Sequence, residues 1–386
     1  MRVLHLLSNW KWTERSEPAV DLALAQTRLG ACVLFVSGRP PRKSKAGGSK
    51  YDVAYHARLK GLTAVHALGL PKHFRLWTAL PDFRKLHGLI QEFRPEIIHC
   101  HMNSAHLLAG LVRKTSAKPL IIKSSYNPEA PRNDFRARFL YRRCTDGIAV
   151  ISAKAKEQAI RCNGFRPESV LVAEPGVDLN RFSPLRRIAV GRDSFGLAEG
   201  SFVVGVVSRI RASRRIDIAL TAIQALAARY PQLELLLVGR GSEGAVNTLI
   251  NEPARRMQIA ERVFPAGYCR DDRLVAAYRA MDVLVYPTPG TDKSCRTVRE
   301  AMAAGLAVIA PKSGFLPDLI EDGYNGLLMD PSGKKLAGIL AGLIDNPPKL
   351  NEIRRQALKT AGDRFSPSLQ AEKMLSFYEK LLTATR

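Results

Sequence analysis

Short apolar runs alternate with longer segments of helical period along the whole chain. An apolar run at 2–8 is followed by a helical pattern at 18–29 and by a second run at 32–37. Later apolar runs lie at 97–101, 120–124, 147–152, 170–174, 202–207, 233–238, 262–266, 282–286 and 306–310. Runs of this length between amphipathic stretches are typical of parallel strands joined by crossover helices. The pattern predicts an α/β protein with parallel sheets.

The apolar rhythm breaks near 183–193, where Pro184 and a charge cluster interrupt it. A chain of 386 residues is long enough for two domains of ordinary size. We therefore expect two doubly wound domains, at 1–186 and 187–365. The last segment, 366–386, is an amphipathic helical pattern and forms a third piece.

Basic residues are concentrated in the first half of the chain. Residues 1–188 hold 32 Lys and Arg against 14 Asp and Glu, whereas residues 189–386 hold 27 against 21. The net charge of +24 is therefore mostly a property of the first half. Nucleic acid, an acidic membrane surface or a phosphorylated substrate would each complement it, and simple tolerance of excess charge is a further interpretation.

The six cysteines are scattered and form no C-x-x-C pair. This spacing argues against a zinc ribbon or a disulfide framework and suits a reducing cytosol. No apolar run approaches the roughly 20 residues of a membrane-spanning helix. The first apolar run is too short for a signal peptide. We expect a cytoplasmic protein that is soluble or bound peripherally to the inner face of the membrane.

The segment 287–311 carries the most chemistry. Two acids, Asp292 and Glu300, have seven residues between them, and a run of small residues follows the second acid up to Gly305. This order predicts a strand, a loop, a short helix and a new strand. The start of such a helix binds anions. A carboxylate one or two turns further in can accept hydrogen bonds from a ribose diol.

This segment resembles the donor-binding signature of the retaining glycosyltransferases of family 4. That signature has two glutamates separated by seven residues and then Ala-Met-Ala-x-Gly; here the first glutamate is Asp292, which is one methylene shorter. The resemblance implies a GT-B fold, in which two Rossmann-like domains face a cleft and the C-terminal helix crosses back to the first domain. It also implies transfer of a sugar, with retention, from a nucleoside diphosphate sugar that is UDP-linked. Neither a cofactor nor a metal ion is implied.

Further motifs match the family in the same order along the chain. They are IIHCHMNSAHLLAG (97–110), GVVSRIRASRR (205–215), LLVGRGSE (236–243) and FPAGYCRDD (264–272). The resemblance implies catalytic roles for His101, Asp292 and Arg209. It implies diphosphate binding by Arg209, Arg214 and the backbone at Arg296 and Thr297, and nucleoside binding by Glu300, Gly239, Gly267 and Tyr268. Taken alone, a histidine at a strand end or an acid near a helix start more often has a structural role.

One departure concerns the loop after the first strand, SNWKWTERSEPA (8–19). Members of the family usually have a pair of glycines there, which lets the backbone approach the donor phosphates. This loop has none, and Glu14 and Arg15 occupy the region. Contacts between this loop and the donor are therefore in doubt, and together with Asp292 the departure leaves altered or lost activity open.

The expected partners are a nucleoside diphosphate sugar, a glycan or glycolipid acceptor such as a lipid-linked oligosaccharide or lipopolysaccharide core, and an anionic membrane surface. Two basic and aromatic stretches, 70–94 and 132–143, suggest the membrane contact, although packing of their apolar residues into the core is the alternative. A rival function is a GT-B sugar-nucleotide hydrolase or epimerase. A non-catalytic nucleic-acid or scaffold protein is a weaker rival, because no recognisable nucleic-acid module is present and nucleic acid is not an expected partner.

Overall fold

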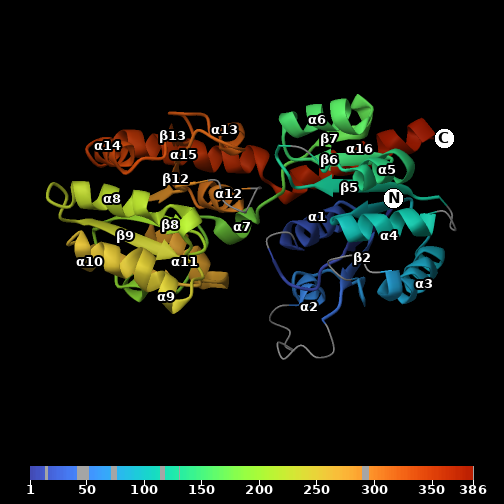
Figure 1. Ribbon diagram of the computed structural model, residues 1–386, viewed down its shortest axis with the longest axis horizontal. Helices are drawn as coiled ribbons and strands as arrows, with labels where there is room; N and C mark the ends of the chain where they lie inside the picture. The colour runs from blue at the N-terminus through green and yellow to red at the C-terminus, as the bar shows by residue number, and fades with distance from the viewer. Residues whose placement is uncertain are drawn as a thin grey trace. The chain divides into compact units, whose positions relative to one another are not determined.

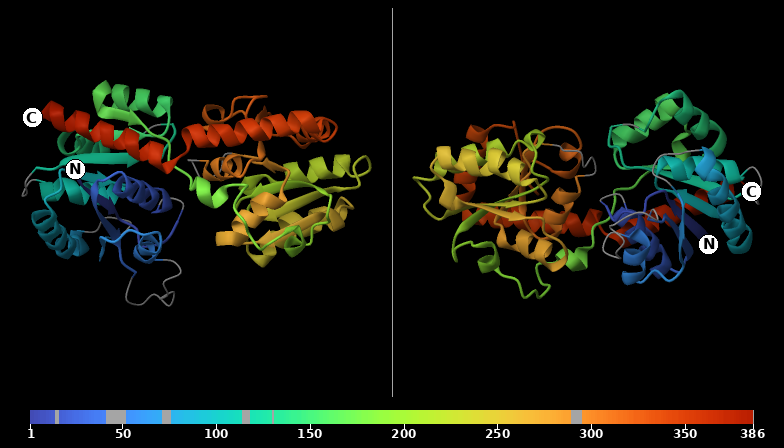
Figure 2. Two further views of the ribbon diagram at one scale, coloured as in Figure 1. Left: turned by 180° about the vertical axis from the view of Figure 1, so that it is seen from behind. Right: turned by 60° about the horizontal axis from the view of Figure 1, so that its bottom comes forward.

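The computed structural model describes residues 1–13, 16–40, 52–70, 76–113, 118–129, 131–288 and 295–385. The chain divides into two compact units. The first contains Met1–Gly176 together with Ser366–Arg386, and the second contains Val177–Phe365. In each unit helices lie on both sides of a sheet (Figures 1 and 2).

The first unit is built on a seven-stranded sheet in the order β3-β2-β1-β4-β5-β6-β7. The strands are β1 (Arg2–Leu7), β2 (Cys32–Gly38), β3 (Val65–Leu68), β4 (Ile97–Cys100), β5 (Leu120–Ser125), β6 (Gly147–Val150) and β7 (Val170–Val172). All neighbouring pairs are parallel. The strands are apolar on both faces, as expected for a parallel sheet that is covered on both sides.

Seven α-helices cover this sheet among the described residues. They are α1 (Ser16–Arg28), α2 (Val53–Leu59), α3 (Leu76–Phe93), α4 (Asn103–Arg113), α5 (Phe135–Cys144), α6 (Ala153–Asn163) and α16 (Pro367–Thr385). Successive residues of β1 point to opposite faces. Val3 therefore joins a cluster with Leu22 of α1 and Met374 of α16, whereas Leu4 joins one with Leu86 of α3. The final helix α16 is thus part of the first unit's core.

The first of the two stretches that suggested a membrane contact, residues 70–94, contributes side chains to the core of the first unit. Within 70–94, Leu86 and Ile90 are buried, and Phe83, Leu89 and Phe93 pack partly buried against the same core. Residues 71–75 lie outside the described part of the chain. The core interpretation therefore holds for these side chains of α3. No helix in the described ranges has both the length and the apolar character that a bilayer crossing requires.

The second unit is built on a six-stranded parallel sheet in the order β10-β9-β8-β11-β12-β13. Its strands are β8 (Phe202–Val207), β9 (Leu233–Val238), β10 (Val263–Gly267), β11 (Val283–Val285), β12 (Ala307–Pro311) and β13 (Leu327–Met329). Its helices are α7 (Leu179–Phe182), α8 (Ile216–Leu226), α9 (Glu243–Val246), α10 (Glu252–Arg256), α11 (Asp271–Ala280), α12 (Arg296–Ala303), α13 (Leu316–Leu319), α14 (Gly333–Ile344) and α15 (Pro347–Arg364). A π-helical segment, Asn247–Asn251, joins α9 to α10.

The helix of the signature segment begins earlier than the small-residue run indicates. It starts at Arg296 rather than at 301, so Glu300 lies in its second turn. The residues Arg-Thr-Val at its start include neither glycine nor proline and are compatible with a helix. The turn before the helix is made by Cys295, whose backbone is in the left-handed region at φ 49°.

The strand order locates the natural binding crevice of each sheet. In open parallel sheets, ligands bind outside the carboxyl ends of the strands, where the strand order reverses. That point lies between β1 and β4 in the first unit and between β8 and β11 in the second. The residues that follow these four strands are therefore the first place to look for a site.

We predict that Arg215→Gly stabilises the second unit. Arg215 precedes α8 in the left-handed region, with φ 48° and ψ 45°, and its guanidinium pairs with Asp217 at 2.9 Å on the surface. Glycine relieves the left-handed strain but loses more entropy on folding, and an exposed ion pair contributes little, so the expected gain is about 0.5–1 kcal/mol in the free energy of unfolding. Urea denaturation measures it.

Arg211→Gly is the matched control. Arg211 is also exposed, but it has an extended backbone at φ −151°, so the same exchange relieves no strain there. Unchanged or lower stability is expected. Equal effects of the two exchanges would contradict the assignment of strain to Arg215.

Candidate active site

Three loops of the second unit are held together at the carboxyl edge of its sheet. The amide of Ser208 donates to Val238 O at 2.9 Å, and the amide of Gly239 donates to Gly267 O at 2.8 Å. Gly239 has φ +156°, and a Cβ there would lie 1.6 Å from the carbonyl oxygen of Ser208. Only glycine fits this position. The structure therefore brings two of the predicted nucleoside-binding glycines, Gly239 and Gly267, side by side.

Tyr268 stands beside these glycines with 53% of its surface exposed. The guanidinium carbons of Arg240 and Arg270 lie 4.6 Å and 4.9 Å from the centre of its ring. Such cation–π contacts hold an aromatic ring in place and leave positive charge next to it. The sequence singled out Tyr268 but neither arginine. Arg270 lies two residues after Tyr268 in the same loop, whereas the approach of Arg240 depends on β9 and β10 being neighbours, which no local motif shows.

Glu300 is the most deeply embedded of the predicted site residues in this unit, with 4% exposure. The Tyr278 hydroxyl donates to its Oε2 at 2.8 Å, and Arg296 Nε–H donates to its Oε1 at 2.6 Å. A buried carboxylate is tolerated when it is paired and hydrogen-bonded in this way. Burial and the neighbouring Glu300 raise the pKa of Tyr278 well above its usual range, so its hydroxyl stays a donor. Tyr278 was not predicted from the sequence.

The start of α12 suits an anion. Cys295 provides no side-chain cap to the helix, and no acid occupies its first turn. Within the described residues of this helix start, no acid neutralises the positive end of the helix dipole. Arg296 and Thr297, whose backbone the sequence analysis assigned to diphosphate binding, lie in the first turn of this helix. The Arg296 side chain turns back to Glu300, and the Thr297 side chain hydrogen-bonds to Tyr278.

The loop after β8 supplies the predicted cations. Arg209 is exposed, and Arg214 is buried in the 3₁₀ turn Ala212–Arg214. The Thr288 hydroxyl, from the loop after β11, donates to Ser213 O at 3.3 Å. The two loops on either side of the strand-order reversal are thus in direct contact. Asp292 lies outside the described residues.

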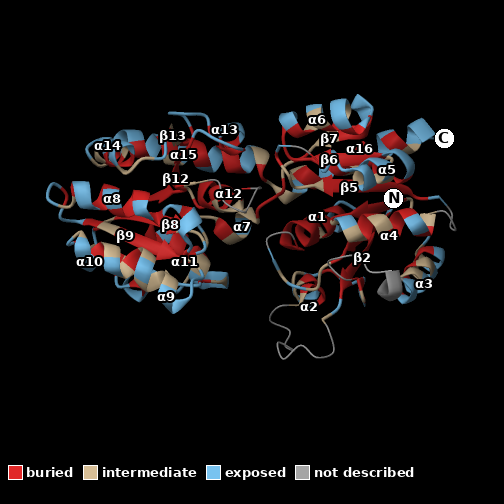
Figure 3. Ribbon diagram, in the orientation of Figure 1, coloured by how far each residue is buried: buried red, intermediate tan, exposed pale blue. Residues whose placement is uncertain are grey.

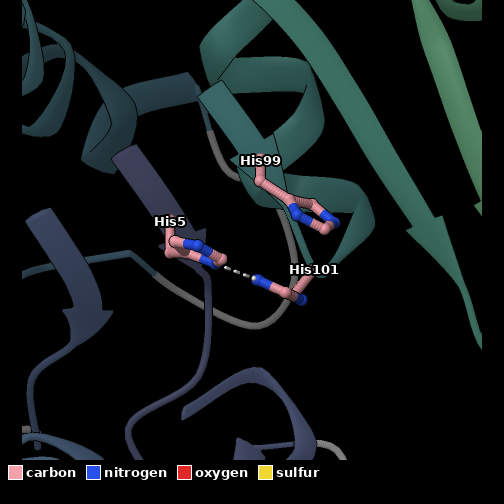
Figure 4. A group of neighbouring side chains, drawn as sticks. All are labelled: His5, His99 and His101. Atoms are coloured by element: carbon pink, nitrogen blue, oxygen red, sulfur yellow. Dashed lines mark hydrogen bonds between the residues drawn. The ribbon is translucent and has the colours of Figure 1, made fainter. Parts of the chain in front are cut away.

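In the first unit, His101 follows β4 at the corresponding reversal and is only 2% exposed. It belongs to a cluster with His5 of β1 and His99 of β4 (Figure 4). His5 and His99 are opposite each other in the sheet register. Their side chains point to the face that α1 and α16 cover. The sequence indicated His101 but not the two histidines that accompany it, because their proximity depends on the pairing of β1 with β4.

A continuous hydrogen-bonded chain runs through this cluster. The oxygen of the Gln26 amide faces His5 Nε2 at 2.7 Å, and an amide oxygen only accepts, so that nitrogen carries hydrogen. His5 Nδ1 then accepts from His101 Nε2–H at 2.9 Å, and His101 Nδ1 accepts from the Tyr126 hydroxyl at 3.0 Å. The buried His101 therefore reaches the half-buried Tyr126 through an acceptor nitrogen.

On the other side of Gln26 the same chain extends to α16. The Gln26 amide nitrogen donates to Tyr378 Oη at 3.4 Å, and Tyr378 contacts His99 Nδ1. His99 Nε2 lies 2.7 Å from Ser124 Oγ. With neutral rings, each imidazole in this arrangement has one donor and one acceptor nitrogen. Burial lowers the pKa of His5 to about 4 and those of His99 and His101 well below the usual value.

The ring geometry favours proton sharing over coordination of a metal ion. The rings of His99 and His101 are stacked, with centroids 4.4 Å apart and an angle of 21° between their planes. A zinc ion lies in the plane of each imidazole that binds it, at about 2.0–2.1 Å from the nitrogen. One ion cannot satisfy two stacked rings at this spacing. In the observed rotamers, these histidines therefore do not form a three-histidine metal site.

Models of known protein families match both halves of the chain. A family model described as Glycosyl transferases group 1 matches residues 190–360, and one described as Glycosyltransferase Family 4 matches residues 19–181. The D-inositol 3-phosphate glycosyltransferase 2 of Catenulispora acidiphila is 33% identical over 250 residues, which are 62% of this chain and 57% of that protein. The chain spans about half the length of the curated relatives it matches.

Solved structures show the same architecture over nearly the whole chain. The crystal structure of Anabaena HepE in complex with UDP has a TM-score of 0.77 and 21% identity, and covers 98% of this chain and 100% of that chain. A glycosyltransferase from Rickettsia africae has a TM-score of 0.80 and 16% identity, with 99% and 98% covered. At these identities the likeness establishes the fold, which is the predicted two-domain α/β architecture.

We predict that the first unit loses stability steeply as the pH falls below about 6.5. Burial also lowers the pKa of His106, to about 3. The unfolded chain takes up protons on these histidines below about pH 6.5, whereas the folded chain does not, so folding becomes less favourable toward acid. Between pH 6.5 and 5 the expected loss is about 2 kcal/mol per histidine, measured by urea denaturation at each pH.

His106→Gln tests this origin. Glutamine can keep the hydrogen bond that His106 Nε2 makes with Thr145 Oγ1 at 2.7 Å, and it does not titrate. The acid-induced loss should shrink by about 2 kcal/mol in this variant. The same exchange at the exposed His66 should leave it unchanged. Equal acid sensitivity of the parent and of His106→Gln would refute the explanation.

Proposed function

Because the chain belongs to the GT-B glycosyltransferases of family 4, we propose that it transfers a sugar from a UDP-linked donor to an acceptor of the cell envelope, with retention at the anomeric carbon. One observation carries the proposal. The buried, hydrogen-bonded Glu300 lies in the second turn of a helix with an uncapped start, next to a cationic loop, at the reversal of strand order. This is the arrangement that a nucleoside diphosphate requires.

The nucleoside binds at Glu300 and the glycine loops. Each carboxylate oxygen has two lone pairs, so Glu300 can accept from a ribose diol while Tyr278 and Arg296 hold it. Gly267 leaves room for the base beside the fixed ring of Tyr268, because no atom lies within 4 Å of a Cβ placed there, and Gly239 allows the close approach of the loop after β8. The carboxylate is therefore oriented before the donor arrives, which reduces the ordering cost of binding.

The diphosphate lies over the start of α12, with Arg209 and Arg214 as its counter-charges. The leaving nucleotide gains negative charge as the glycosidic bond breaks, and fixed guanidinium groups stabilise this charge without reorganising. They supply the charge that a divalent ion supplies in other transferases, so we propose that the reaction is independent of metal. In this proposal Asp292 contacts the donor sugar, and His101, which is hydrogen-bonded to Tyr126, has a catalytic role. Retention then follows from front-face substitution, in which the leaving phosphate assists the incoming hydroxyl.

The acceptor is anionic in this proposal. The excess of basic residues in the first half of the chain suits a phosphate-bearing acceptor. A lipid-linked or envelope glycan is one source of such a group. The names of the curated relatives refer to D-inositol 3-phosphate, so a phosphorylated polyol is the other. We propose that the enzyme works in the cytoplasm or at the inner face of the membrane.

Glu300→Gln and Glu300→Ala are expected to lower the affinity for UDP by roughly tenfold to hundredfold, because each lost charge-assisted hydrogen bond contributes about 1.5–3 kcal/mol. Tyr278→Phe should have a smaller effect, since Arg296 still holds the carboxylate. Titration calorimetry on the folded proteins measures the affinities. Glu252→Ala, at an exposed acid of α10, is the matched control and should bind UDP like the parent. Parent-like affinity in both Glu300 variants would remove the ribose assignment.

Arg209→Ala is expected to reduce the turnover of UDP-glucose by orders of magnitude, and Arg214→Ala substantially, because both leave the developing diphosphate charge less stabilised. Arg209→Lys, which keeps the charge without the planar geometry, should recover part of the rate. UDP release is the readout, with and without EDTA. Loss of turnover on chelation that manganese restores would overturn metal independence. Free glucose as the main product with every phosphorylated acceptor would favour the hydrolase over the transferase.

A further inference from the structure

Helix α5 (Phe135–Cys144) exposes two large aromatic side chains. Phe135 is 84% and Phe139 54% exposed. Most residues of this helix are exposed, in contrast to the strands beside it (Figure 3). Single exposed apolar residues are ordinary, but two phenylalanines one turn apart form a continuous apolar ridge.

The outward face of α5 is arranged symmetrically. At about 100° per residue, Phe135 and Phe139 lie about 40° apart around the helix axis. Arg138 and Arg142 fall within about 60° on one side of this pair, and Arg136 and Arg143 within about 60° on the other side. The outward face therefore has an aromatic centre with two arginines along each border. We call this surface the aromatic–arginine face.

The inward face of the same helix is firmly packed. Tyr141 and Cys144 are buried. A Cβ added at Gly110 of α4 would lie 2.8 Å from the Cβ of Cys144, so α4 and α5 are in close contact. Asp134 caps the helix by accepting from the Ala137 amide at 3.0 Å. The aromatic–arginine face is thus the outer side of a fixed helix.

Most of the arginines on this face are not neutralised within the protein. Arg132, just before the helix, pairs with Asp134 at 2.6 Å, and Arg138 donates to Asn133 Oδ1 at 2.7 Å. Within the described ranges, Arg136, Arg142 and Arg143 form no ion pair with a carboxylate. Their charge is available to an external anion.

We infer that the aromatic–arginine face of α5 docks on a bilayer that contains anionic lipid. Interfacial helices insert an apolar ridge among the acyl chains while flanking cations reach the headgroups. Nucleic acid fits this face less well, because single strands bind in grooves with stacking platforms, whereas this ridge is convex. A second copy of the chain would oppose like charges.

The position of α5 connects this surface to the proposed chemistry. The chain leaves the carboxyl end of β5, passes Tyr126 and enters α5 at Phe135, so one connection joins the hydrogen-bond partner of His101 to the aromatic–arginine face. The Asn163 side chain fixes this connection by donating to Arg132 O at 2.9 Å. The inference deepens the proposed function and rests on it in one respect: a lipid-linked acceptor would be presented by the same membrane.

Sedimentation of the full chain with vesicles tests the inference. The probes are phosphatidylcholine vesicles with and without phosphatidylglycerol. Binding should require the anionic lipid and weaken with salt. Phe135→Ser with Phe139→Ser should lower the partition coefficient roughly tenfold or more, because the apolar ridge is lost. Arg136→Ser, Arg142→Ser and Arg143→Ser together should lower it by roughly a hundredfold, at about fivefold per arginine.

Matched control variants test whether vesicle binding depends on this surface or on exposed apolar and basic residues anywhere on the protein. Leu59→Ser with Leu80→Ser removes two exposed leucines from α2 and α3. Arg255→Ser, Arg256→Ser and Lys359→Ser remove the same charge from exposed positions of the second unit. Both controls should bind vesicles like the parent. Phe139→Trp should retain binding, because tryptophan also inserts at the interface.

The outcomes distinguish this inference from the proposed function. Parent-like vesicle binding in the phenylalanine variant, equal partitioning into neutral and anionic vesicles, or no binding to either would overturn the docking surface. The docking surface would also be overturned if the α5 variants bound vesicles like the parent and lost only binding to a single-stranded oligonucleotide. The α5 variants should retain UDP affinity, which is read separately. If the parent protein bound anionic vesicles but did not bind UDP, the result would count against the proposed function and would leave the docking surface supported.

Discussion

Both sheets are closed on their two faces by helices, and this burial constrains every polar group inside. A buried polar group without a partner is costly, so each one in the sheet interior must be hydrogen-bonded. Polar groups that can bind a ligand therefore lie in the loops at the carboxyl edge of each sheet and not in its interior. At its own strand-order reversal, the second sheet holds the cations and the uncapped helix start, and the first sheet holds His101. The positions of these groups are therefore a consequence of the layered architecture.

Two buried polar clusters meet this constraint in different ways. The carboxylate oxygens of Glu300 are satisfied because Tyr278 and Arg296 both donate to them. The three histidines are neutral because burial lowers their pKa values, and they hydrogen-bond to one another and to their neighbours. The first arrangement gives a fixed acceptor for donor hydroxyl groups. The second links β1 and β4 to α1 and α16, and it makes the stability of the first unit dependent on pH.

The two basic and aromatic stretches of the first half differ in whether their apolar side chains are buried. In α3 the apolar residues Leu86 and Ile90 enter the core, so the basic residues of that stretch border an ordinary amphipathic helix. In α5 the apolar residues Phe135 and Phe139 face outward instead, between arginines. The two stretches have similar composition, and their difference lies in which face the sheet covers. Only the second has the character of an interfacial surface.

The sequence by itself determined the two parallel sheets, because apolar runs of strand length between amphipathic segments have few other solutions. Through the resemblance to the donor-binding signature of family 4, it also indicated Glu300, the cationic loop after β8 and the glycines at 239 and 267, because those motifs are local in the chain. Tyr278, the Arg240 and Arg270 contacts with Tyr268, and the partners of His101 were decided by the tertiary structure. Apart from Arg270, which lies two residues after Tyr268, these groups come from segments distant in sequence, and strand order rather than local pattern determines which segments become neighbours.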